Sequence, residues 1–158
     1  LEKSLKRNYY WAEREWPYKN VKPRIIAERF MAEKSGNGLI DYKFYCFNGI
    51  PEFLYISNGM DNHKTARLSF LTMNWEKAPF GRSDYLEFET IPPRPRKLDE
   101  MVQIAKSLSE GRPFLRVDLY EISEQVYFSE LTFSPCGGFM PFVPEGWDEK
   151  LGDMINIC

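Results

Sequence analysis

Hydrophobic residues alternate with polar ones in the second half of the chain. Over residues 115–119 every second residue is aliphatic, and the positions between them are Arg116 and Asp118. Because successive side chains of a strand point to opposite faces, this spacing predicts a strand over residues 114–122 with the charged pair on one face. A similar pattern predicts a partner strand over residues 126–133.

A hairpin and a helix are indicated elsewhere along the chain. Asn48-Gly49 joins two extended runs, residues 41–47 and 51–57, and this dipeptide suits a turn in which both positions need positive φ. Apolar residues at helical spacing predict a helix over residues 98–108, which ends before Gly111. The remaining predicted elements are helices over 1–15 and 147–155, strands over 24–31 and 67–72, and a proline-rich surface excursion over 74–96.

These elements together favour an α+β domain with a mainly antiparallel sheet and flanking helices. The length of 158 residues and the hydrophobic content of 43% suit a single domain over residues 1–158. Missing partner strands would leave exposed sheet edges, so association into a homo-oligomer stays open.

Composition narrows the function classes. The net charge is −2 and basic residues are interspersed with acidic ones, so we expect no nucleic-acid partner. The three cysteines form no CxxC pair, which argues against structural zinc and suits a reducing cytoplasm. No apolar run reaches the roughly 20 residues of a membrane helix, so we expect a cytoplasmic protein without a membrane span.

Two carboxylates stand out in the late strands. If the connection has an odd number of residues, such as 123–125, residues whose numbers sum to 248 pair with each other. Asp118 then lies opposite Glu130, and Arg116 lies opposite Thr132. A two-residue turn would instead separate the carboxylates.

Carboxylates directly across a ladder repel each other and call for a compensating cation. Magnesium is the natural candidate, since it prefers one or two carboxylates together with phosphate oxygens and water. Arg116 on the same face suits a phosphoryl group by charge and geometry. The alternative is that Asp118 and Glu130 are solvated residues on the outer face of a two-stranded ribbon.

The stretches 116–120 and 127–135 resemble the paired metal-binding strands of ATP-grasp ligases. Nearly the whole chain resembles the TupA-like ATP-grasp family, named from teichuronopeptide biosynthesis. This resemblance implies the C-terminal half of an ATP-grasp catalytic unit, with the N-terminal phosphate-binding part, a lysine and Gly-rich loop, absent. Six further stretches carry it in order: residues 8–10, 14–20, 22–28, 41–44, 98–101 and 151–155.

The resemblance also implies roles for residues of the late strands. Asp118 and Glu130 would be magnesium ligands, and Arg116 would stabilise the γ-phosphate of ATP. Thr132 stands where many ATP-grasp enzymes have a metal-ligating Asn, and its neutral hydroxyl is a weaker ligand.

The same resemblance implies nucleotide contacts for four residues that precede the late strands in the chain. Glu28 and Met31 would pair with adenine through main-chain groups, Asp41 would lie near the ribose hydroxyls, and Lys43 near the phosphates. Glu28 as an ordinary strand-end charge, and Asp41 with Lys43 as a solvated hairpin face, are the alternatives.

The implied function is that of an ATP- and magnesium-dependent carboxylate–amine ligase in cell-surface polysaccharide or teichuronopeptide biosynthesis. A carboxylate would be activated as an acyl phosphate and then captured by an amine. The implied partners are ATP and a small carboxylate or an acidic saccharide, and this chain alone would be an incomplete enzyme. Two alternatives are a glycosyltransferase in surface polysaccharide synthesis and a non-catalytic nucleotide-binding domain.

Overall fold

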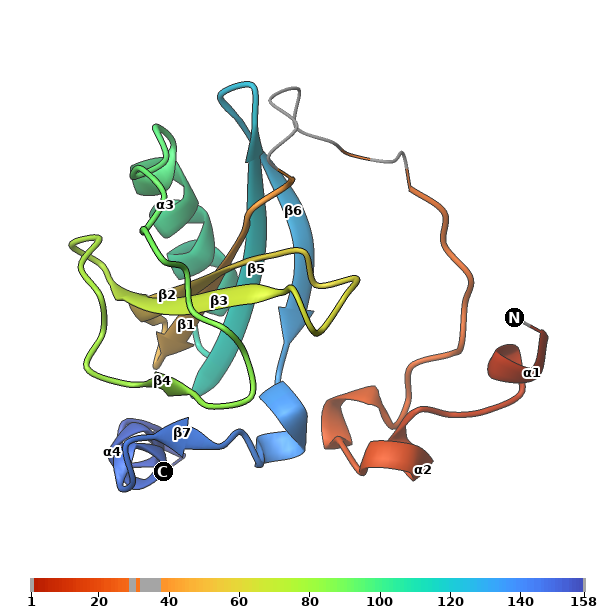
Figure 1. The fold of residues 1–158 in the computed structure, drawn as a ribbon. Helices are drawn as coiled ribbons and strands as arrows, with labels where there is room; N and C mark the ends of the chain where they lie inside the picture. Colours follow the sequence, from red (N-terminus) through yellow and green to blue (C-terminus); the bar gives the residue numbers. More distant parts are fainter. Residues whose placement is uncertain (1, 29–30, 32–37, 158) are drawn as a thin grey trace.

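A five-stranded antiparallel sheet organises the molecule (Figure 1). The computed structural model describes residues 2–28, 31 and 38–157. The strand order is β3-β2-β1-β5-β6, and every neighbouring pair runs antiparallel. This confirms the predicted α+β class. The strands are β1 (Asp41–Phe47), β2 (Ile50–Asn58), β3 (Arg67–Thr72), β5 (Phe114–Ile122) and β6 (Gln125–Thr132).

The β1–β2 hairpin forms where the sequence predicts it. Asn48 has φ of 51° and Gly49 has φ of 81°, so both turn residues adopt the left-handed conformation that favours Asn-Gly. The hairpin places β1 at the centre of the sheet, between β2 and β5.

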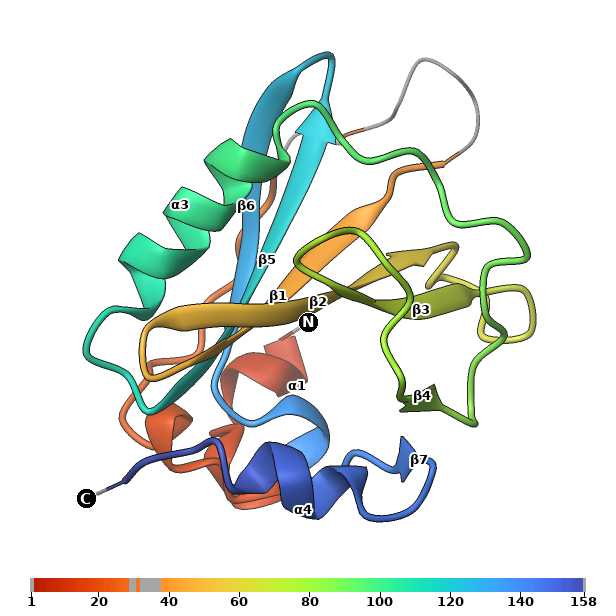
Figure 2. The same cartoon turned by 90° about the vertical axis from the view of Figure 1, so that its left-hand side faces the viewer.

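Helix α3 (Leu98–Ser109) covers one face of the sheet (Figure 2). It confirms the predicted helix and extends it by one residue. Met101 and Ala105 are fully buried against aliphatic side chains of the strands. That core is built from the residues Tyr42, Phe44, Cys46, Leu54, Ile56, Leu71, Leu98, Met101, Ala105, Leu115, Val117 and Leu119.

A second, aromatic core covers part of the opposite face. Phe53 and Phe70 of the sheet pack against Phe80 with ring centroids 4.9 and 5.3 Å apart. Phe80 belongs to the loop over 74–96, so that predicted surface excursion is partly buried and carries the short strand β4. The elements on this side are β4 (Gly81–Arg82), η2 (Pro135–Gly138), β7 (Phe142–Val143) and α4 (Trp147–Gly152), the last shorter than the predicted helix over 147–155.

Residues 2–28, here called the N-terminal segment, differ from prediction. The single helix expected over residues 1–15 is replaced by α1 (Glu2–Leu5) and α2 (Tyr10–Glu13), followed by η1 (Trp16–Tyr18). The strand predicted over 24–31 is wrong for residues 24–28, which are irregular, while 29–30 lie outside the described residues.

The reason for both errors lies in packing. Ile25 and Ile26 are 53% and 78% exposed, so this part of the segment has no apolar surface to pack against, and short helices without such packing are marginal. Tyr18 contacts Phe133 with ring centroids 6.2 Å apart. That contact joins the segment to the end of β6, beside η2 (Figure 1).

Candidate functional site

A row of charged side chains crosses the three strands β1, β5 and β6. Lys43 pairs with Asp118, and Asp118 pairs with Glu130. In the next row Arg116 pairs with Thr132. The predicted partners in the late strands are therefore confirmed, and Lys43 joins them from β1.

The pairing arises by a different route from the one predicted. The β5–β6 connection has only two residues, Ser123-Glu124, which by itself would separate Asp118 from Glu130. A β-bulge next to Asp118 restores the pairing, because Ser129 has no partner in the ladder. Bulges of this kind re-aim side chains near functional sites.

Asp118 is fully buried and held by two cations. The Nε and Nη2 atoms of Arg116 donate to its two carboxylate oxygens at 2.8 and 2.7 Å. Lys43 Nζ donates to Asp118 Oδ2 at 2.5 Å. A buried carboxylate without such partners would cost several kcal/mol, so this pairing is what allows Asp118 to sit in the sheet.

Glu130 completes the cluster at its half-exposed edge. Its Oε1 accepts a hydrogen bond from Arg116 Nη2 at 2.7 Å and lies 3.9 Å from Lys43 Nζ. Burial raises the pKa of Glu130, and the neighbouring Asp118 raises it further, whereas the two cations lower it. The charged form of Glu130 is therefore less favoured here than in water.

Arg116 stays charged in this setting. Burial lowers its pKa, but the hydrogen bonds to Asp118 and the electrostatic interactions with Tyr55, Asp118 and Tyr45 together outweigh that effect, and the pKa is raised overall. The guanidinium also lies 5.9 Å from the centroid of the Tyr55 ring. It therefore provides a fixed cation between the two carboxylates.

Asp41 borders the cluster on β1. Its Oδ2 accepts a hydrogen bond from Ser57 at 3.4 Å, and its Oδ1 lies 4.0 Å from Lys43 Nζ. Among the described residues, Oδ1 is a buried side-chain oxygen without a hydrogen-bond partner. An oxygen of this kind is suited to accept from a ligand hydroxyl or to contact a cation.

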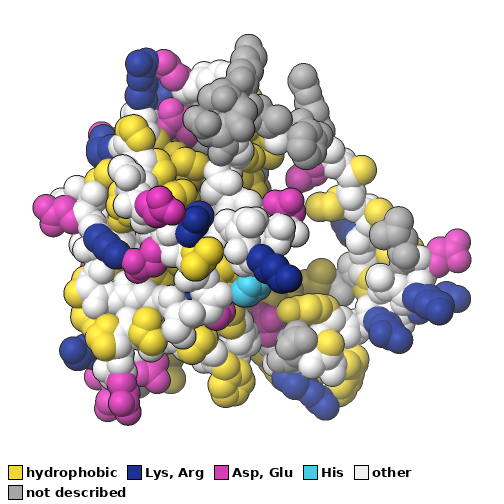
Figure 3. Space-filling model, in the orientation of Figure 1, with side chains coloured by type: hydrophobic (Ala, Val, Ile, Leu, Met, Phe, Trp, Pro, Cys, Tyr) yellow, Lys and Arg dark blue, Asp and Glu magenta, His cyan; other side chains and the backbone are white. Residues whose placement is uncertain are grey.

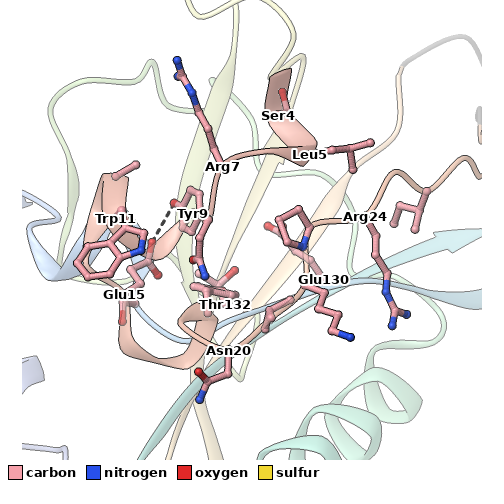
Figure 4. Close-up of a pocket in the computed structure, with 18 of the residues that line it drawn as sticks. Ser4, Leu5, Arg7, Tyr9, Trp11, Glu15, Asn20, Arg24, Glu130 and Thr132 are labelled. Carbon is pink, nitrogen blue, oxygen red and sulfur yellow. Dashed lines mark hydrogen bonds between the residues drawn. The ribbon is translucent and has the colours of Figure 1, made fainter. Parts of the chain in front are cut away.

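A large cavity opens over this cluster. It has a volume of about 1710 Å³ and lies between the N-terminal segment and the sheet (Figure 4). Arg116, Glu130 and Thr132 form part of its floor. The cavity thus gives Arg116 and Glu130 access to a ligand, whereas Lys43, Asp118 and Asp41 do not line it.

Glu28 and Met31 do not line that cavity. Glu28 is exposed and Met31 is half-buried. Four of the predicted residues, Lys43, Arg116, Asp118 and Glu130, meet in one cluster, while Asp41 and Thr132 flank it. The adenine contacts assigned to Glu28 and Met31 stay predictions.

The cavity wall opposite the sheet received no site role from the sequence, although residues 8–10 and 14–20 carry the family resemblance. Tyr9, Glu15 and Tyr18 line it, and Tyr9 donates to the buried Glu15 Oε1 at 3.0 Å (Figure 4). Burial raises the pKa of Tyr18, and the charge of Glu15 raises it further. No local spacing links these residues to β6, so only the tertiary contact identifies them.

The donor set fits magnesium in its chemistry. Asp118 and Glu130 share the single nitrogen Arg116 Nη2, and Asp41 Oδ1, 4.0 Å from Lys43 Nζ, has no hydrogen-bond partner. Within the described ranges, no group of three or more His, Cys, Asp or Glu is arranged to hold a metal by itself. Two carboxylates completed by phosphate oxygens and water are the arrangement that Mg²⁺ commonly uses.

The sheet, the charged row and the covering cavity together define an α+β protein with the surface expected of a nucleotide-binding domain. The chain belongs to the TupA-like ATPgrasp family, whose model matches residues 1–156. No curated protein and no solved structure matches it. None of the helices described is long and apolar enough to cross a bilayer.

Proposed function

We propose that this protein is an ATP- and magnesium-dependent carboxylate–amine ligase in cell-surface polysaccharide or teichuronopeptide synthesis. One observation carries the proposal: Lys43, Asp118, Glu130 and Arg116 converge on one sheet face, and two of them, Arg116 and Glu130, line the floor of a large cavity. Membership of the TupA-like ATPgrasp family also supports nucleotide binding of the ATP-grasp type.

The proposed reaction has two steps. An oxygen of the substrate carboxylate attacks the γ-phosphorus of ATP, the bond from that phosphorus to the bridging oxygen breaks, and ADP leaves. An amine nitrogen then attacks the acyl carbon, inorganic phosphate leaves, and the nitrogen loses a proton. Phosphoryl transfer of this type depends on positioning and on neutralising charge.

Asp118 and Glu130 would hold Mg²⁺, with Thr132 as a weak third ligand. The bound ion would neutralise charge on the β- and γ-phosphate oxygens. Arg116 would hold the transferring γ-phosphoryl group, and Lys43 would hold the neighbouring phosphates. Asp41 would accept from a ribose hydroxyl through Oδ1, which has no hydrogen-bond partner.

Nucleotide binding would change the partners of the two cations. Lys43 and Arg116 both donate to Asp118, and phosphate oxygens compete for such donors. Transfer of the two cations from Asp118 to the phosphates would free the carboxylate oxygens for Mg²⁺. The adenine contacts of Glu28 and Met31 complete the proposed nucleotide site.

A nucleotide-binding role without catalysis is the second candidate. The complete pairing of buried Asp118 with Arg116 and Lys43 favours it, because such a network also serves a purely structural purpose.

Trapping of the acyl phosphate separates the two candidates. The full-length protein would be incubated with Mg²⁺-ATP, hydroxylamine and either L-glutamate or D-galacturonate, and hydroxamate and ADP would be measured. The ligase predicts both products, with ADP formation about 100-fold slower in Glu130→Gln, as for loss of one charge-stabilising group, and absent in Asp118→Asn.

The matched control is Glu89→Gln, which removes an exposed carboxylate that pairs with Arg67 on the edge strand β3 and does not belong to the cluster. Near-ultraviolet circular dichroism would establish that each variant is folded. Full turnover in folded Glu130→Gln would refute the proposed site, and nucleotide binding without ADP or hydroxamate would favour the non-catalytic role.

A further inference from the structure

Exposed aromatic rings gather on the N-terminal segment. Trp11 and Trp16 are 63% and 68% exposed, and their rings lie 5.2 and 6.1 Å from the ring of the half-buried Tyr10. Arg14 and Lys19 complete this surface, here called the aromatic patch. Of its five residues, Trp11 alone lines the cavity. The aromatic patch therefore lies largely outside the candidate nucleotide site.

Each exposed tryptophan of the aromatic patch has a cation over its ring. The Arg14 guanidinium lies 4.9 Å from the centroid of the Trp11 ring, and Lys19 Nζ lies 4.2 Å from that of Trp16. In the part of the chain that the structure describes, neither cation forms an ion pair with a carboxylate. Both positive charges are thus available to an anionic partner.

The N-terminal segment is basic although the whole chain is acidic. Residues 1–28 contain seven Lys or Arg against four Glu, a net charge of +3, whereas the whole chain carries −2. One of those acids, Glu15, is buried and accepts a hydrogen bond from Tyr9. Figure 3 shows basic side chains beside hydrophobic ones over this segment. The asymmetry would turn the segment towards a negatively charged surface.

The composition of the segment favours a lipid bilayer over a protein partner. Four of its seven basic residues are Lys, a residue that is depleted in protein–protein interfaces. Exposed Trp beside Lys and Arg is instead typical of proteins that lie on a membrane surface. The indole ring suits the headgroup level, and long basic side chains attract the phosphates of anionic lipids.

We propose that the aromatic patch binds the surface of an anionic lipid bilayer. The rings of Trp11 and Trp16 enter the headgroup layer, and Arg14 and Lys19 bind lipid phosphates beside them. Because Trp11 also lines the cavity, binding holds the cavity close to the membrane surface. The contact lies on the bilayer without crossing it, and it does not rest on the proposed ligase function.

Co-sedimentation of the full-length protein with lipid vesicles tests the proposal. Vesicles with equal amounts of phosphatidylcholine and phosphatidylglycerol should bind the protein, and vesicles of phosphatidylcholine alone should bind it much more weakly. Binding to the mixed vesicles should weaken as salt rises, because exposed charges are screened. Equal binding to both kinds of vesicle, or no binding to either, would overturn the proposal.

Paired substitutions of cations locate the binding surface. Arg14→Gln/Lys19→Gln should bind the mixed vesicles about 30-fold more weakly, the usual contribution of two basic residues at an anionic surface. The matched control, Lys106→Gln/Arg112→Gln, changes the net charge equally but removes two exposed cations outside the N-terminal segment. It should bind like the unmodified protein. An equal loss in both double variants would overturn the assignment to the aromatic patch.

Substitutions of the rings test whether they enter the bilayer. Trp11→Ala/Trp16→Ala should bind at least about tenfold more weakly, also at high salt, because salt does not screen apolar contacts. Trp11→Phe/Trp16→Phe should keep most of the binding but lose the quenching of tryptophan fluorescence by lipids with brominated acyl chains. Quenching that persists in this variant would come from Trp75 or Trp147 and would overturn the assignment.

A second copy of the chain is the competing occupant of the aromatic patch. Sedimentation velocity without lipid should give the same oligomeric state for the unmodified protein and for Trp11→Ala/Trp16→Ala. Near-ultraviolet circular dichroism would establish that each variant is folded. A dimer that dissociates in the alanine variant, with vesicle binding unchanged, would show that the rings join two copies and would overturn the proposal.

Discussion

Charged groups and aromatic rings have opposite environments in the sheet and in the N-terminal segment. In the sheet, Asp118 is fully buried and paired with Arg116 and Lys43, and aromatic side chains pack in a closed core. In the N-terminal segment, Trp11 stays exposed and Arg24 has no ion pair among the described residues.

This contrast separates residues that support the fold from residues that are open to a ligand. Buried pairs hold their geometry because breaking them leaves an uncompensated charge. Exposed, unpaired groups contribute little to stability and are available for binding. The cavity lies where the two kinds of surface face each other.

The largest expected effect comes from breaking the buried pairing. Asp118→Leu would leave Arg116 and Lys43 without their main partner, and we expect a loss of about 3–5 kcal/mol in the free energy of unfolding. Urea denaturation followed by circular dichroism would measure it. A loss below about 1 kcal/mol would mean that the cluster does not stabilise the sheet.

A smaller and local effect is expected inside the N-terminal segment. Tyr9→Phe removes the donor to the buried Glu15 carboxylate, and an unsatisfied buried group costs about 1–3 kcal/mol. Hydrogen exchange should become faster at the amides of residues 10–19 and stay unchanged in α3. Faster exchange throughout the sheet would show that the two regions unfold together.

The pH dependence of stability should distinguish Glu130 from the exposed acids. Because its pKa is raised from an ordinary value near 4.5, the folded state holds more protons than the unfolded state between the two pKa values. Stability therefore falls as pH rises through that window, and the loss is complete above the raised pKa.

Glu130→Gln should remove this fall, so that its unfolding free energy changes less between pH 4 and pH 7 than that of the unmodified protein. Thermal melts across that range would measure the difference. A steeper fall in the variant would contradict the assigned direction of the pKa.

The smallest effect is expected at the unpaired cations of the cavity wall. Lys22→Gln/Arg24→Gln should change the free energy of unfolding by no more than about 0.5 kcal/mol, as surface substitutions usually do. Urea titration would verify this. A loss of several kcal/mol would show that the two cations support the fold and are not reserved for a ligand.

The five strands of the sheet and the hairpin were predictable because their signals are local. The alternation around Arg116 and Asp118 and the dipeptide Asn48-Gly49 each fix backbone geometry within a few residues. The pairing of Asp118 with Glu130 was predicted correctly from an incorrect loop length. The bulge at Ser129 that rescues it has no distinct sequence signal.

The N-terminal segment was not predictable in the same way. Its apolar spacing indicates one helix, but Trp11 and Ile26 stay exposed, and the segment meets the end of β6 through the contact of Tyr18 with Phe133. The ion pairs that Arg116 and Lys43 form with the carboxylates assigned to magnesium were also not predicted, and the assignment to magnesium stays a prediction. Lys43 reaches Asp118 only through strand pairing between distant parts of the chain.

A crystal structure of the full-length protein with Mn²⁺ and a non-hydrolysable ATP analogue tests the metal site most directly. Manganese replaces magnesium at oxygen sites and can be located by anomalous scattering. The account predicts a peak within direct coordination distance of Asp118 and Glu130 oxygens, with Arg116 moved towards the phosphates. A bound nucleotide whose metal lies elsewhere, with both Arg116–Asp118 hydrogen bonds intact, would contradict it.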